Sequence, residues 1–163
     1  MRLLNRIISL GLILILLFGI NTSFTHAHIN EHKQENNSLF SGLDSAAAQA
    51  VIQFHSALQS GNENMARKLL ADDILIYEGG GIERSAEEYA NHHMKADMKY
   101  LKNLKVKLLE HQVMVFGNMA YSTARTLMQG EYNGKNINSN GMETIVLQKI
   151  NGEWLITHIH WSN

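Results

Sequence analysis

The sequence contains no cysteine and no proline. Without cysteine the protein cannot rely on disulfides, so its fold must rest on a packed apolar core, and about 120 residues are enough to form one. It also lacks a stripe of basic residues with interleaved aromatic residues, which excludes the usual surface for binding nucleic acid. No apolar segment reaches the roughly 20 residues that a membrane span needs.

The first 27 residues are typical of a cleaved secretory signal peptide. Arg2 and Arg6 precede an almost unbroken apolar run over residues 7–20, and small residues surround position 27. Removing residues 1–27 takes two of the 14 basic and none of the 15 acidic residues, which leaves a net charge of −3. We therefore expect a protein exported to the periplasm or the extracellular space, with no stable membrane insertion after cleavage. An uncleaved N-terminal anchor is the alternative.

Helical patterns dominate the first half of the mature chain. Residues 28–42 are polar and predict a flexible leader before a domain at residues 43–163. Apolar residues recur at three- and four-residue steps over 43–60, and Gly61 fits the position after a helix end. Asn62 can cap a short second helix. A short strand follows at 74–78, and Ser85 with Glu88 forms a capping-box pattern for a third helix ending near Lys102.

The second half reads as strands joined by short turns. Residues 106–116 and 119–129 flank Gly117-Asn118, with a further turn at Asn133-Gly134. A change of phase predicts a β-bulge near Leu109 and Glu110. The chain therefore belongs to the α+β class, with about three N-terminal helices covering one face of a curved antiparallel sheet.

The terminal hairpin carries the first group of candidate site residues. Asn151-Gly152 between two apolar runs predicts a two-residue turn, so that Ile150 faces Glu153. Counting outward pairs Glu143 with His160 and Ile145 with His158. Strand alternation then predicts one face that is apolar near the turn and titratable at its far end. Its members are Glu143, Ile145, Leu147, Trp154, Ile156, His158 and His160.

The third helix carries the second group. Helical spacing predicts that His93 and Asp97, one turn apart, lie in the middle of the buried stripe, flanked by Tyr89. A helix packed on the sheet would bring them to Glu143, His158 and His160. His93 could then act as a general acid or base, with Asp97 orienting it. His160 completes the candidate catalytic set. The candidate ligand-binding residues are Tyr77, Tyr89, Glu143 and His158.

Several alternatives stay open for these residues. His93, Asp97 and His160 have the chemistry of a site for a divalent transition metal, although no typical ligand spacing is present. A buried hydrogen-bond network without function would also explain them.

Tyr77 and Glu78 end a strand beside a glycine turn, where a pocket rim often lies, but alternation lets only one of the two side chains face inward. His55 and His111 are isolated and are interpreted as surface or core residues. Glu110 and Arg125 predict an exterior cross-strand ion pair.

Three strings resemble the SnoaL-like branch of the nuclear transport factor 2-like superfamily: residues 77–81, 88–97 and 152–162. The resemblance covers residues 43–163 and is strongest to small exported members of unassigned function. It implies a cone, in which a bent sheet wraps around helices and leaves an internal cavity. The superfamily includes ketosteroid isomerase, scytalone dehydratase, polyketide cyclases, limonene epoxide hydrolase and non-catalytic association modules, so the fold does not fix one activity.

The sequence therefore favours an exported domain that binds a small, partly apolar molecule. Any catalysis would be proton transfer without a cofactor, as in an isomerase, dehydratase or hydrolase. The alternatives are a metal-binding protein of the cell envelope and a non-enzymatic interaction module. A homodimer formed through the open face of the sheet is also expected.

Overall fold

The structure is a computed structural model that describes residues 38–163. The predicted signal peptide and residues 28–37 of the predicted leader lie outside the described residues. Within residues 38–163, no helix is long and apolar enough to cross a bilayer. The elements follow in the order β1 (Phe40–Ser41), α1 (Ala46–Ser60), α2 (Glu63–Lys68), β2 (Leu70–Glu78), β3 (Gly81–Glu83), α3 (Ala86–Asn91), α4 (Met94–Lys102), β4 (Leu104–Phe116), β5 (Met119–Tyr132), β6 (Lys135–Ile150) and β7 (Glu153–Ser162).

Capping residues set the ends of the first two helices, although α1 begins at Ala46 and not at residue 43 as expected. The Ser45 side chain accepts a hydrogen bond from the Ala48 N–H at the start of α1, and Gly61 ends the helix with φ of 73°. The Asn62 side chain then accepts from the Met65 N–H and starts α2. Each side-chain cap satisfies a backbone donor that the first helical turn leaves without a partner.

The predicted third helix is divided into two helices, and this corrects the expected position of His93. The helix breaks at His92 and His93, so α3 ends at Asn91 and α4 starts at Met94. After the break the buried residues are Met94 and Met98, one turn apart, and His93 is exposed. Burying two Met side chains at this spacing removes far more apolar surface from water than burying an imidazole and a carboxylate.

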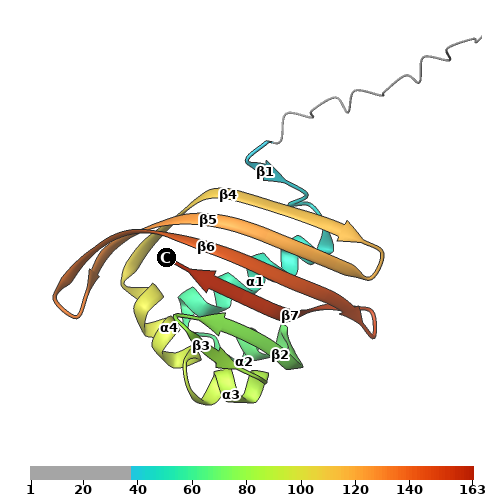
Figure 1. Cartoon of the computed structure of the whole chain (residues 1–163), viewed down its shortest axis with the longest axis horizontal. Helices are drawn as coiled ribbons and strands as arrows, with labels where there is room; N and C mark the ends of the chain where they lie inside the picture. Colours follow the sequence, from blue (N-terminus) through green and yellow to red (C-terminus); the bar gives the residue numbers. More distant parts are fainter. Residues whose placement is uncertain (1–37) are drawn as a thin grey trace, which may run out of the picture. The chain divides into compact units, whose positions relative to one another are not determined.

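Seven strands form one curved, open sheet in the order β1-β4-β5-β6-β7-β2-β3, and the helices lie against one of its faces (Figure 1). Strands β4 to β7 form an antiparallel meander. The β1–β4 and β2–β7 pairs are parallel, so the sheet is antiparallel only in part. β1 lies within the predicted flexible leader, where Phe40 pairs with His111. The α+β class and the bent sheet are confirmed.

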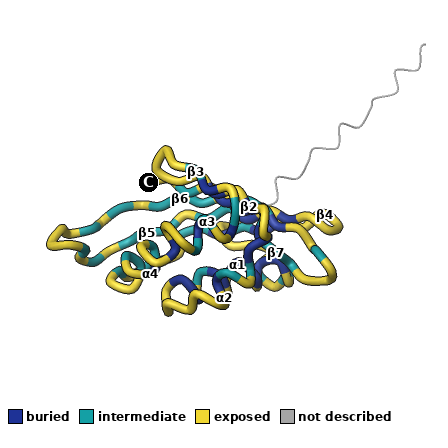
Figure 2. Tube along the Cα trace, turned by 90° about the horizontal axis from the view of Figure 1, so that it is seen from below, coloured by how far each residue is buried: buried dark blue, intermediate teal, exposed yellow. Residues whose placement is uncertain are grey.

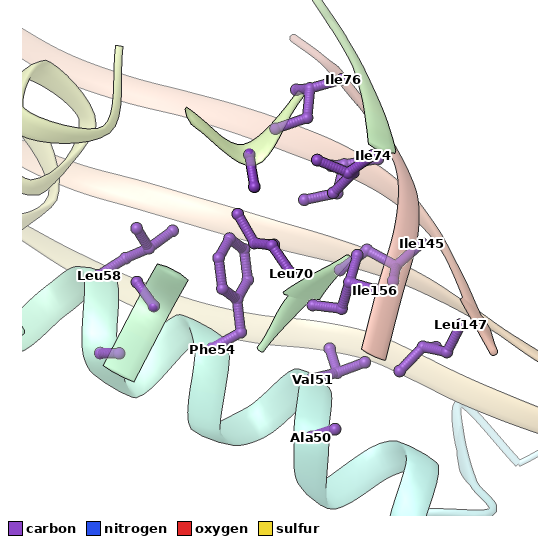
Figure 3. Close-up of a cluster of buried hydrophobic side chains, with 14 of the residues drawn as sticks. Ala50, Val51, Phe54, Leu58, Leu70, Ile74, Ile76, Ile145, Leu147 and Ile156 are labelled. Atoms are coloured by element: carbon purple, nitrogen blue, oxygen red, sulfur yellow. The ribbon is translucent and has the colours of Figure 1, made fainter. Parts of the chain in front are cut away.

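A row of buried side chains crosses the inner face of the sheet and forms the base of the core. Val113, Ser122, Ile145, Ile159 and Ile76 are register partners on five neighbouring strands, and each is at most 4% exposed. Helix α1 covers this row with Val51, Phe54 and Leu58 (Figure 3). Figure 2 shows the same pattern as dark blue stretches in α1, β2 and β7.

Two β-bulges set which side chains face the helices. The bulge predicted near Leu109 is confirmed, because the β4–β5 register shifts between Leu108 and Glu110. A second bulge, which simple strand alternation does not predict, lies at Thr157: Leu147 pairs with Ile156, whereas Val146 pairs with His158. The Ile150–Glu153 pairing is confirmed. One extra residue reverses the facing of every later side chain in the strand.

Candidate functional site

A second row crosses the inner face beside the apolar row, and it is polar. His111, Ala124, Glu143, Trp161 and Glu78 are register partners on β4, β5, β6, β7 and β2. Glu143 therefore pairs with Trp161, and the predicted pairing with His160 is wrong. The bulge at Thr157 turns the indole of Trp161, and not the imidazole of His160, toward this face of the sheet.

A cavity of about 760 Å³ lies between this polar row and helices α1 and α4. Leu58 and Leu101 form part of its apolar wall on the helix side, and Val106 and Met128 form part of it on the sheet side. Pockets of this size and composition, with a few polar groups in an apolar wall, are typical of small-molecule sites. The ionisable side chains in the lining are His55, Glu78, Asp97, Tyr100, His111 and Glu143.

The centre of the polar row is an ion pair between helix and sheet. Nε2 of His55, on α1, lies 3.0 Å from a carboxylate oxygen of Glu143. The indole N–H of Trp161 donates to Oε2 of the same carboxylate at 2.7 Å. The Glu143 side chain is 8% exposed and that of His55 is 38% exposed. Glu143 is therefore fixed by two donors, while His55 keeps access to the cavity.

The ion pair shifts both of its pKa values toward the charged forms. Burial opposes charge on His55, but the attraction of Glu143 and their hydrogen bond outweigh it and raise the pKa of His55 above 6.5. Burial likewise opposes charge on Glu143, yet His55 and the indole donor lower its pKa below 4.5. The pair is therefore ionised at slightly acid to neutral pH.

This pair predicts a specific dependence of stability on pH. The contribution of His55 is complete below its unfolded pKa near 6.5 and is lost as the pH rises through its raised folded pKa. The contribution of Glu143 is complete above 4.5 and is lost as the pH falls through its lowered folded pKa. Urea unfolding of the wild type and of His55→Gln/Glu143→Gln should differ most between these two values. A difference that stays constant from pH 4 to 9 would contradict the ion pair.

His111 is a second imidazole at the buried end of the row. It is 4% exposed, and its Nε2 lies 2.9 Å from Oγ of the fully buried Ser122. Burial lowers the pKa of His111 more than Glu143 raises it, and the nearby His55 lowers it further. His111 is therefore neutral near pH 7, next to a charged His55.

Asp97 reaches the cavity from the other side, because the helix break places it there. In a straight helix Tyr89 and Asp97 would lie about 12 Å apart along the axis. After the break, the buried Tyr89 hydroxyl donates to Oδ2 of Asp97 at 2.8 Å. Burial raises the pKa of Asp97, although the Tyr89 hydrogen bond and nearby His93 work against this shift. Burial and the nearby Asp97 carboxylate also raise the pKa of Glu78.

His93 lies outside the cavity lining and pairs with a different acid from the one expected. Its Nδ1 lies 2.5 Å from Oε1 of Glu83 on β3. The His93 side chain is 64% exposed, whereas that of Glu83 is 7% exposed. The hydrogen bond and charge of Glu83 raise the pKa of His93. The expected contact between His93 and Asp97 is therefore replaced by one with Glu83, and only a longer-range electrostatic influence connects His93 to Asp97.

Tyr77, His158 and His160 lie together on the opposite face of the sheet from the cavity. The ring centroid of Tyr77 is 5.4 Å from that of His158 and 6.5 Å from that of His160. The bulge at Thr157 causes this placement, and Ile159 and Trp161 face inward instead. The prediction that both imidazoles share a face with Glu143 is wrong.

The alternative metal set, His93, Asp97 and His160, is not brought together by the fold. His93 pairs with Glu83, Asp97 lines the cavity, and His160 packs beside Tyr77 on the other face. In the part of the chain that the structure describes, no three His, Asp or Glu side chains are placed to hold a metal ion.

His55 and His111 are site residues that the sequence pattern does not predict, although it contains weak signals for both. His55 directly follows Phe54 and lies four residues after Val51, both of which are buried. His111 is two residues before the buried Val113 and shares its strand phase. The expected Glu110–Arg125 pair is confirmed, with 3.9 Å between Nε and Oε2.

Comparison with known proteins agrees with this architecture. A family model described as the SnoaL-like domain matches residues 47–163. The chain belongs to the SnoaL-like domain family. A crystal structure from Shewanella frigidimarina, described as a candidate ketosteroid isomerase, is 56% identical. Its match covers 76% of this chain and 99% of that protein, with a TM-score of 0.74.

Solved structures below 25% identity share the fold alone. A protein of unknown function from Shewanella oneidensis, described as NTF-2 like, is 19% identical over 72% of this chain and 97% of its own, with a TM-score of 0.57. The association domain of CaMKII from C. elegans is 17% identical over 71% and 92% of the two chains, with a TM-score of 0.59. No curated protein matches the chain.

Proposed function

We propose that this SnoaL-like domain binds a small, partly apolar molecule in its cavity and transfers a proton on it without a cofactor. The observation that carries the proposal is the His55–Glu143 ion pair at the centre of an apolar cavity of about 760 Å³. His55 is the proton donor and acceptor, and Glu143 orients it. Asp97, on the facing helix, contacts the ligand. This assignment keeps Asp97 and Glu143 from the sequence prediction and replaces His93 with His55.

The geometry of His55 defines its part in the reaction. Glu143 holds Nε2, which leaves Nδ1 as the ring atom that can exchange a proton with the ligand. The charge of Glu143 stabilises the imidazolium that forms when His55 accepts a proton. The fixed indole donor of Trp161 keeps the carboxylate in place. These three residues give a base with a set orientation inside a largely apolar wall.

The 56% identical protein described as a candidate ketosteroid isomerase supports proton transfer next to a carbonyl group. The reaction class is therefore removal of a proton from carbon, followed by its return or by loss of a leaving group. A neutral cyclic ketone such as 2-decalone is a suitable probe. Exchange of its α-hydrogens in D₂O, followed by NMR, measures the proton transfer directly.

The expected result is exchange faster with wild type than in buffer, and at least tenfold slower with Glu143→Gln. Ala124→Phe should also reduce exchange, because Ala124 lines the cavity and the new ring fills it. Leu127→Phe is the matched control, since Leu127 lies on the same strand in the opposite phase, outside the lining. Equal exchange rates for the Ala124→Phe and Leu127→Phe variants would show that the reaction does not take place in the cavity.

A second candidate function, self-association, follows from the outer face of the sheet. One row of register partners crosses five strands of this face and consists of Met114, Tyr121, Val146, His158 and Leu75. Met114 is 46% and Leu75 37% exposed, an unusual amount of apolar surface for a free sheet face. We propose a homodimer through this face. Sedimentation should give a dimer for wild type and a monomer for Tyr121→Lys; a monomeric wild type would contradict it.

Export is a further part of the proposal, and it rests on the pattern of residues 1–27. Expression in a bacterial host should yield a protein that has lost about 27 residues. Intact mass spectrometry measures the loss directly. A product that keeps its N-terminal residues after expression in an export-competent host would contradict a cleaved signal.

A further inference from the structure

The ionisable side chains that line the cavity carry an excess of negative charge. Among residues 38–163, three side-chain carboxylates reach the lining, from Glu78, Asp97 and Glu143, and no Lys or Arg side chain does. The positive charge of His55 balances the negative charge of Glu143 in their ion pair. His111 is neutral and therefore balances no carboxylate. The carboxylates of Glu78 and Asp97 are therefore left without a cation in the lining.

Both carboxylates keep oxygen atoms available for a ligand. Oδ2 of Asp97 accepts the Tyr89 hydroxyl, and no other side-chain bond is made by Asp97 within residues 38–163. Glu78 lies on β2 next to Trp161 of β7 and is exposed, so it marks the open end of the polar row. Both side chains line the same cavity, and the charge of Asp97 contributes to the raised pKa of Glu78.

The ionisable groups around these two acids do not cancel their charge. His93 and Glu83 form an ion pair with each other outside the cavity lining. Tyr89 contributes a hydroxyl donor, and its pKa is raised by burial and by Asp97, so that it stays neutral. Together, Glu78, Asp97, Glu83 and His93 are three acids and one base, with a net charge near −2 when all are ionised.

We propose that the ligand of this cavity carries a basic nitrogen, held as an ammonium group between Asp97 and Glu78. This inference rests on the proposed function and names the chemical class of its ligand. The apolar body of the ligand lies along Leu58 and Leu101, toward the His55–Glu143 pair. Glu78 and Glu143 are two strands apart in one row, so their backbones are about 10 Å apart and the ligand spans the space between them.

The physical basis is the balance of desolvation and attraction. A half-buried carboxylate without a cationic partner, as Asp97 is, is destabilised, and a bound ammonium group would pair with Asp97 and with the exposed Glu78 at once. An anionic ligand meets repulsion from the same groups, and a neutral ligand gains only hydrogen bonds. Negative charge at the mouth of an apolar cavity also attracts cations during diffusional approach.

Three matched probes test this inference on the full chain: 4-phenylbutylamine, 4-phenylbutanol and 4-phenylbutyrate. Calorimetry at pH 7 should show the amine binding at least tenfold more tightly than the alcohol, and the acid most weakly. The affinity for the amine should increase as the pH rises through the raised pKa values of Asp97 and Glu78, because ionised carboxylates bind the cation.

Asp97→Asn/Glu78→Gln should bring the amine to within about threefold of the alcohol, while the control Glu87→Gln, an exposed acid of α3, retains the preference. Should the double variant be unstable, the pH dependence of the wild type decides alone. Equal or tighter binding of the alcohol or the acid would overturn the ammonium site and leave the cavity as a binding site. No binding of any probe would overturn it together with the proposed cavity.

Discussion

Phe54→Ala should lower the free energy of unfolding by about 3–5 kcal/mol, the usual cost of removing a fully buried aromatic side chain. Phe54 is 0% exposed and projects from α1 toward the sheet in the centre of the core (Figure 3). Its ring is nearly parallel to that of Trp161, with centroids 6.5 Å apart and 6° between the planes. Loss of the ring removes apolar contacts from the helix and also the neighbour that holds the indole. Urea denaturation measures the effect.

Gln53→Ala is the matched control, because Gln53 is the preceding residue of the same helix and is exposed. Its stability should stay within about 0.5 kcal/mol of wild type. Both variants replace one α1 side chain by alanine, so a general effect on helix propensity would appear in both. Similar losses for the two variants would mean that α1 does not dock on the sheet through Phe54.

Glu143→Leu should cost about 2–3 kcal/mol of stability, because it leaves two donors without their acceptor. The imidazole of His55 and the indole N–H of Trp161 both depend on this one carboxylate. The expected loss lies below that of a completely buried ion pair because the His55 side chain is 38% exposed and can lose its proton or bind water. The measurement is again urea unfolding, at a pH near 6, where both partners are charged in the wild type.

Glu143→Gln separates the hydrogen bonds from the charge. The amide can still accept from Trp161, so this variant should lose less stability than Glu143→Leu, by about 1 kcal/mol. Proton exchange on the ketone should nevertheless fall in both variants, because neither stabilises the imidazolium of His55. A Glu143→Leu variant as stable as wild type would show that the Glu143 carboxylate makes no stabilising contact with His55 or Trp161.

The elements near each turn could be predicted from sequence because their determinants are local. Gly61, Asn62 and Ser85 mark helix ends through hydrogen bonds or backbone angles that involve only adjacent turns. Asn151, with φ of 52°, and Gly152, with φ of 89°, form the predicted hairpin turn. Their effect does not depend on tertiary packing, and a single sequence therefore reveals it.

The site residues were predicted less well than the turns, because one inserted residue in β7 reverses which of its later side chains face the helices. Ile156 and Ile159 are both buried, and they are three residues apart instead of two. That spacing signals the bulge at Thr157, whose hydroxyl donates to the Val146 carbonyl. Without the bulge, His160 would replace Trp161 beside Glu143, as the simple hairpin count predicts. The choice between the two depends on packing against α1, which local spacing does not contain.

The helix break had a similar effect on His93. A continuous helix places His93 and Asp97 on one face, but Met94 and Met98 compete for the core at the same four-residue step. The apolar pair is buried, and Asp97 enters the cavity through its bond to Tyr89. The sequence alone does not show which of the two pairs is buried, because this depends on the surface on which the helix packs.

NMR titration of the His55 imidazole in wild type and in Glu143→Gln is the direct test of the His55–Glu143 ion pair. We expect a His55 pKa above 6.5 in wild type and a clear fall when the carboxylate is removed, because burial alone then acts on the ring. The same carboxylate would then stabilise the imidazolium that forms when neutral His55 removes a proton from the ligand. A His55 pKa that is the same in both proteins, or below 6.5 in wild type, would contradict this ion pair.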